Sequence, residues 1–127
     1  MSAQIKPTNS RTKGASAERE FCRLIHAHLG AALARNLEQS RNGGHDLIAP
    51  GDDPISAALN RYAIECKRYR TITPGLLAGF WRQAEDQASR CGKAPVLAYR
   101  ADRQQWRVLV PLRCLNAKAF GEDYSEA

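Results

Sequence analysis

A carboxylate and an ammonium stand one residue apart at Glu65 and Lys67, in a segment over residues 61–67 that has the pattern of a strand. Successive side chains of a strand point to opposite faces, so both charges share a face, about 6.6 Å apart along the strand. A carboxylate that binds a metal ion beside an ammonium that positions a water is suited to hydrolysis. The same pair would also fit an exposed salt bridge, worth roughly 0–1 kcal/mol. Taken alone, the E-x-K pattern leaves both interpretations open.

Asp46 is a second candidate, because it begins a predicted strand directly after Gly43, Gly44 and His45. Small residues at that point would let another backbone or a phosphate approach closely. Carboxylates from two neighbouring strands can supply the oxygen ligands that Mg²⁺ requires. An aspartate in a turn also commonly accepts hydrogen bonds from local amides, which is the alternative interpretation.

A third carboxylate comes from a helix predicted between Ser16 and Gly30. On a helical wheel centred on Phe21, Glu18 falls about 60° from the apolar stripe and Glu20 about 100° from it. Glu18 therefore points further toward whatever the helix packs on, and a partly buried acid needs a cation or metal nearby. Either glutamate could instead simply stabilise the first turn of the helix.

The elements that must position these residues alternate between helix and strand. After the first helix, strands are predicted over residues 34–39, 46–49 and 61–67, with a turn at 41–44 and a connection at 50–60. A second helix should run from Thr73-Pro74 to Gly92, followed by strands over 95–99 and 106–110. The buried stripe of that helix is predicted to be Leu77, Phe80, Trp81, Ala84, Ala88 and Cys91. This order predicts an α/β fold in which helices flank a mixed central sheet.

The chain has 127 residues, which suits one domain. We expect a flexible basic arm over residues 1–14, a single domain over 15–120 and a loose tail over 121–127. The 19 Lys and Arg against 13 Asp and Glu leave a net charge of +6, which favours a polyanionic partner such as nucleic acid. Four cysteines without a C-x-x-C pair, and no apolar signal or membrane segment, favour reduced thiols and a cytoplasmic location, in a host cell if a phage encodes the protein.

Three stretches in this order resemble the PD-(D/E)XK nuclease superfamily: residues 13–20, the run Gly43-Gly44-His45-Asp46, and Glu65-Cys66-Lys67. Within it the chain is most similar to archaeal-type Holliday junction resolvases and related phage nucleases, over roughly residues 13–110. His45 stands where the superfamily's name has proline. The resemblance implies a three-layer α/β/α, restriction-endonuclease-like fold and a Mg²⁺ cofactor that Mn²⁺ can replace.

The resemblance also implies a role for each site residue. Asp46 and Glu65 would bind the metal with the backbone carbonyl of Cys66, Glu18 would complete the site, and Lys67 would position or activate the attacking water. Basic residues that flank these positions are predicted to contact DNA phosphates: Lys13, Arg19, Arg35, Arg41, Arg68 and Arg70. Weaker candidates for contacts with the site or with DNA are His45, Gln83 and Gln87.

Three functions remain open at this stage. The first is a Mg²⁺-dependent, structure-specific endonuclease that resolves four-way DNA junctions as a homodimer, since symmetric cuts need two active sites. The second keeps the chemistry but acts as a nicking or end-processing nuclease of phage or mobile-element origin. The third is a catalytically silent nucleic-acid-binding module on the same scaffold, against which the joint presence of Asp46, Glu65 and Lys67 argues.

Overall fold

The computed structural model describes residues 10–36 and 46–115, with side chains from residue 14 onward. Its first half contains helix α1 (Ser10–Leu29), strands β1 (Ala34–Arg35) and β2 (Leu47–Ile48), and helix α3 (Pro54–Leu59). Its second half contains β3 (Tyr62–Tyr69), α4 (Pro74–Cys91), β4 (Ala94–Ala101), β5 (Arg107–Leu109) and the 3-10 helix η2 (Leu112–Cys114).

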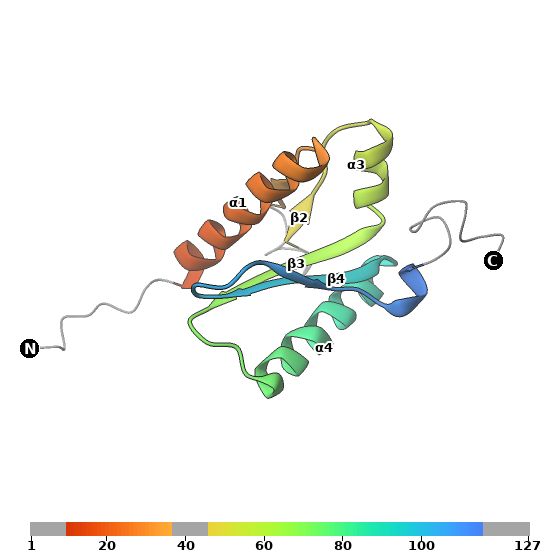
Figure 1. Cartoon of the computed structure of the whole chain (residues 1–127). Helices are drawn as coiled ribbons and strands as arrows, with labels where there is room; N and C mark the ends of the chain where they lie inside the picture. The colour runs from red at the N-terminus through yellow and green to blue at the C-terminus, as the bar shows by residue number, and fades with distance from the viewer. Residues whose placement is uncertain (1–9, 37–45, 116–127) are drawn as a thin grey trace, which may run out of the picture.

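The five strands form one sheet in the order β1-β2-β3-β4-β5. Only β3 and β4 run parallel, and the other three pairs are antiparallel. A parallel pair needs a long crossover, which α4 supplies. Helix α1 covers one face of the sheet and α4 the other (Figure 1). The predicted three layers around a mixed sheet are confirmed.

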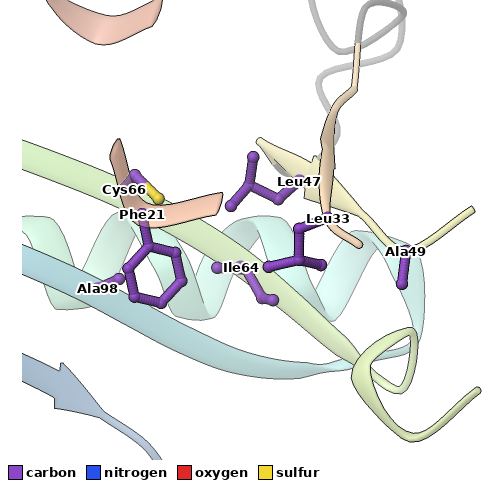
Figure 2. Close-up of a cluster of buried hydrophobic side chains, with 7 residues drawn as sticks. All are labelled: Phe21, Leu33, Leu47, Ala49, Ile64, Cys66 and Ala98. Atoms are coloured by element: carbon purple, nitrogen blue, oxygen red, sulfur yellow. The ribbon is translucent and has the colours of Figure 1, made fainter. Parts of the chain in front are cut away.

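A separate apolar cluster lies on each face of the sheet. Under α1, the ring of Phe21 packs on Ile64 and Ala98, in a cluster that also holds Leu33, Leu47, Ala49 and Cys66 (Figure 2). On the α4 face, Phe80 and Ala84 pack with Leu97. Strand β3 is therefore covered on both faces, and Glu65 lies inside the protein instead of in solvent, with Lys67 half-buried beside it.

Helix α1 begins six residues earlier than the predicted start at Ser16. Residues 10–14 of the predicted arm therefore belong to this helix. The helix can extend to residue 10 because Gly14 weakens it by only about 1 kcal/mol relative to alanine and because residues 10–13 contain no proline. The rest of that arm, the turn at 41–44, residues 37–39 of the predicted first strand and the tail at 121–127 lie outside the described residues.

Two further predictions about helices need correction. The 50–60 connection contains α3, which Asp53 caps by accepting a hydrogen bond from the Ser56 amide at 2.9 Å, with Pro54 in the first turn. Helix α4 has the predicted Thr73 cap, and Gly92 ends it with φ of 67°. Cys91 is exposed, although it was predicted in the buried stripe, because the helix ends there and the chain turns away at Gly92.

Candidate active site

Three hydrogen bonds hold Asp46 between the segment that follows β1 and the central strand β3. Its amide donates to the Ile64 carbonyl at 3.0 Å, and its own carbonyl accepts from the Asn36 amide at 2.7 Å. Its side-chain Oδ2 accepts from the Cys66 amide at 2.8 Å. That amide is 20 residues away in the chain, so this carboxylate joins two strands instead of capping a local turn. The bond places it beside Glu65.

Glu65 is a buried acid that sits next to a second acid. Its residue is 2% exposed. The pKa of Glu65 is raised to about 8, mainly by burial and then by the negative charge of Asp46 and a hydrogen bond with its side chain, while Lys67 opposes the shift. Two carboxylates that share a low-dielectric site cannot both ionise easily. In the metal-free protein Asp46 and Glu65 therefore hold a proton between them near neutral pH.

Lys67 supplies the positive charge of the group. Its Nζ lies 5.3 Å from the centroid of the Phe80 ring on α4, a cation–π distance. That ring packs in turn on Tyr69, with 4.9 Å between centroids. Since the ammonium also lowers the pKa of Glu65, the two charges lie within electrostatic reach of each other. The structure thus brings Asp46, Glu65 and Lys67 together at one place on the sheet.

Glu18 is buried as predicted, at 7% exposed, and reaches the site through its charge. Burial is the main cause that raises the pKa of Glu18, and the charge of Asp46 adds to it. Its Oε1, however, accepts a hydrogen bond from Arg35 Nε at 2.8 Å. The carboxylate that sequence reasoning placed in a metal site is therefore paired with an arginine of β1.

A divalent ion fits the Asp46–Glu65 pair. Glu65 Oε1 is buried and has no hydrogen-bond partner among the described residues, which is costly unless a cation satisfies it. Carboxylate oxygens are the donors that Mg²⁺ prefers, with waters completing its shell. Within the described residues, no group of three or more His, Cys, Asp or Glu side chains is placed to hold a metal ion by itself. The two acids meet the requirement as a pair, and Glu18 does not join them while it is paired with Arg35.

Cys66 takes part in the site through its backbone amide, which donates to Asp46, and not through its thiol. Burial raises the pKa of the Cys66 thiol well above its usual value, and the charges of Asp46 and Glu18 add to the shift. A protonated thiol is a poor nucleophile and a poor metal ligand. The predicted role of its carbonyl as a ligand stays a prediction.

The structure also shows a role for Glu20 that sequence reasoning missed. Its carboxylate accepts hydrogen bonds from Arg100 at 2.6 Å, Trp106 at 2.8 Å and Arg68 at 3.1 Å. These donors come from β4, the segment before β5, and β3, so one side chain of α1 ties the helix to three parts of the sheet. The sequence alone does not indicate that Arg68 and Arg100 are neighbours, because they come together only when β3 pairs with β4.

Glu20→Gln is expected to destabilise the protein by roughly 1–2 kcal/mol, because an amide cannot pair with two guanidinium groups. The urea midpoint of unfolding measures the change. Asp86→Asn is the matched control, since it breaks an exposed pair with Arg90 within one helix and should cost only a few tenths of a kcal/mol. Equal losses in the two variants would show that the Glu20 network does not join the layers.

The residues predicted to contact DNA fall into three groups. Arg19 and Arg70 are exposed, whereas Arg35 and Arg68 are in ion pairs with Glu18 and Glu20. Gln83 is exposed and Gln87 is half-buried on α4. The side chain of Lys13, and all of Arg41 and His45, lie outside the described part of the chain.

Comparison with protein families identifies the chain. The family model described as "Phage putative PDDEXK endonuclease" matches residues 9–125. The chain belongs to this family. Comparison with curated proteins found no significant match. Among solved structures, Archaeoglobus fulgidus Hjc, described as a Holliday junction resolvase from an archaeal hyperthermophile, is 21% identical with a TM-score of 0.49, covering 82% of this chain and 76% of that chain.

Family membership confirms the predicted superfamily and restriction-endonuclease-like fold, and it makes the chain a PDDEXK endonuclease with DNA as the implied substrate. Nucleases of this superfamily typically use a divalent metal, which agrees with the fit of the Asp46–Glu65 pair. No helix in the described part of the chain is long and apolar enough to cross a membrane.

Proposed function

We propose that this PDDEXK endonuclease is a Mg²⁺-dependent enzyme that cleaves branched DNA by phosphodiester hydrolysis, with Asp46, Glu65 and Lys67 as its catalytic residues. The buried Asp46–Glu65 pair carries the proposal. Two acids side by side raise each other's cost of ionisation, and such an arrangement is retained where a cation or a proton transfer makes use of it. A surface salt bridge between Glu65 and Lys67 is not compatible with this burial.

Each residue then has a defined task. Asp46 and Glu65 would hold Mg²⁺ with the Cys66 carbonyl, and Mn²⁺ would substitute. When bound, the ion would lower the pKa of a water and neutralise charge on the phosphate during in-line attack. The hydrogen bond from the Cys66 amide orients the Asp46 carboxylate. Glu18 would join the metal ligands after exchanging its contact with Arg35.

Lys67 would act on the attacking water or on a phosphate oxygen. Its side chain is half-buried, and its ammonium lies 5.3 Å from the centroid of the Phe80 ring and within electrostatic reach of Glu65. A cation fixed beforehand at the point where negative charge develops stabilises a transition state more than a mobile one does. Its distance from Glu65 along the strand, about 6.6 Å, leaves room for a phosphate between them.

A four-way junction is the substrate we favour. The motifs at residues 13–20, 43–46 and 65–67 resemble those of archaeal-type junction resolvases, and the net charge of +6 suits a compact polyanion. Resolution requires symmetric cuts, so we propose that two copies act as a homodimer. The described surface offers large exposed apolar side chains for such contacts, among them Val108 in the edge strand β5 and Leu112 at the start of η2.

The test is cleavage of a mobile four-way junction with Mg²⁺, with Mn²⁺ and with a chelator, beside flapped, nicked and linear DNA of matched sequence. We expect paired symmetric cuts in the junction, at a rate at least about tenfold above the rate on linear duplex, and none with the chelator. Light scattering of the free protein and of its junction complex would report the dimer.

Other outcomes would favour the other two functions. Preferred cleavage of flapped or nicked DNA would identify a nicking or end-processing nuclease of phage or mobile-element origin. DNA binding without cleavage and without Mg²⁺ or Mn²⁺ binding would identify a silent DNA-binding module. Both results would reject junction resolution, and only the second would reject the assigned active site.

A further inference from the structure

A cavity of about 390 Å³ lies beyond the acidic pair, where β3 and β4 end and α4 begins. Its walls come from the segment after β3, the first turn of α4 and the hairpin between β4 and β5. Three arginines line it: Arg70, Arg100 and Arg107. Sequence reasoning assigned no role to the last two.

Two of these arginines carry uncompensated charge. Arg100 is neutralised by Glu20, which lies 2.6 Å from its Nη1. The one acid in the wall, Asp102, faces Arg68 at 3.5 Å. Arg70 and Arg107 are both exposed, and neither has an ion-pair partner within the described residues. The cavity therefore carries an excess of positive charge, to which the N-terminal end of the α4 dipole adds.

The cavity lies on the same side of the sheet as the catalytic lysine. In the β3–β4 register Tyr99 pairs with Lys67, and Tyr99 is also part of the cavity wall. Arg70 follows Lys67 by three residues, which is about 10 Å at the rise of a strand. One strand of duplex DNA rises about 3.4 Å per nucleotide, so that distance is enough to reach a phosphate different from the one that is cut and within a few nucleotides of it.

The chemistry of the wall selects an anion over an apolar small molecule. Sites for small organic ligands are lined mostly by hydrophobic and aromatic side chains. Here arginines stand with neutral hydrogen-bonding groups such as Thr71, Thr73 and Gln105. A guanidinium with hydroxyl and amide neighbours is suited to binding phosphate oxygens.

We propose that Arg70 and Arg107 bind a phosphodiester group of the DNA strand within a few nucleotides of the phosphate that is cut. This inference rests on the proposed nuclease function and extends it. The contact positions the DNA backbone over the sheet, and it takes no part in the chemistry at Asp46 and Glu65.

The first experiment measures the salt dependence of DNA affinity in a cleavage-deficient Asp46→Asn background, with a four-way junction and linear duplex as probes. Arg70→Gln with Arg107→Gln should weaken binding roughly tenfold and reduce the slope of log K against log salt by about 0.9, the value for one neutralised phosphate. The control is the double variant Arg61→Gln with Arg90→Gln. It also removes two positive charges, but at the ends of β3 and α4 that are opposite to the cavity. It should leave the slope nearly unchanged.

The second experiment locates the contact by replacing single phosphates of the substrate with neutral methylphosphonates. The background protein should lose affinity at one position within a few nucleotides of the cut, and the Arg70 and Arg107 variant should show no further loss there. Binding with an unchanged slope, or equal sensitivity at every position, would overturn the phosphate site and leave the nuclease proposal intact. If the Asp46→Asn protein did not bind DNA at all, both proposals would be rejected.

Discussion

Asp46→Asn and Glu65→Gln are each expected to lower the rate of DNA cleavage by at least about 10³-fold while DNA affinity changes by less than about threefold. Each substitution removes one negative charge from the pair that would hold Mg²⁺. The loss falls on the transition state, where charge on the phosphate must be neutralised, and the more distant contacts with the DNA backbone remain. Single-turnover cleavage and equilibrium binding to the same junction would separate the two effects.

Both variants should fold, which makes the loss of rate interpretable. Asparagine keeps a side-chain oxygen that can accept the hydrogen bond from the Cys66 amide. Glutamine has the shape of the protonated acid that Glu65 already is for part of the time near neutral pH. Matched controls are Asp52→Asn and Glu85→Gln, which remove the same charges from exposed positions and should cleave normally. Cleavage at the wild-type rate by either site variant would reject the assignment.

Local patterns were sufficient to predict the elements that carry the site. The alternation through β3 placed Glu65 and Lys67 on one face, and the Thr73 cap and Gly92 stop predicted α4 within a residue. Both signals act over a few neighbouring residues, so they do not depend on the rest of the fold. The acidic cap of α3 is a signal of the same kind, and it was missed because Pro54 was interpreted as part of a connection.

Burial and partner choice could not be predicted in this way. The alternation in β3 shows which residues share a face, but α4 must pack on that face before Glu65 becomes buried. The helical wheel ranked Glu18 above Glu20 correctly for burial. It could not show that Arg35 pairs with Glu18, or that two arginines and a tryptophan converge on Glu20, since those contacts join distant strands.

The metal-free protein is expected to lose stability as the pH rises from about 5 to about 9, by on the order of 3 kcal/mol. Burial and the charge of Asp46 raise the pKa of Glu65 to about 8, from an ordinary value of 4.5 in the unfolded chain. Between these values the folded protein binds more protons than the unfolded chain. Stability is then complete below the lower pKa and is lost as the pH passes through the upper one.

Urea unfolding midpoints measured with a chelator between pH 5 and pH 9 would test this, and Glu65→Gln should remove most of the slope. The negative charge of Asp46 helps to raise the pKa of Glu65, so Asp46→Asn should lower that pKa. We therefore expect this variant to lose less stability between pH 5 and pH 8 than the wild type does. Keeping below pH 9 avoids the ionisation of the Cys66 thiol, whose raised pKa has the same sign.

A divalent ion should reverse the loss. Above pH 8 the pair is mostly charged, and an ion that binds only the folded state at a hundred times its Kd adds about 2.7 kcal/mol. Mg²⁺ or Ca²⁺ should therefore stabilise the wild type more at pH 8.5 than at pH 6, because at the lower pH the ion must displace the proton first. Glu65→Gln should show little stabilisation at either pH. A slope that persists in Glu65→Gln, or an ion effect independent of pH, would show that the buried pair neither holds the proton nor binds the metal.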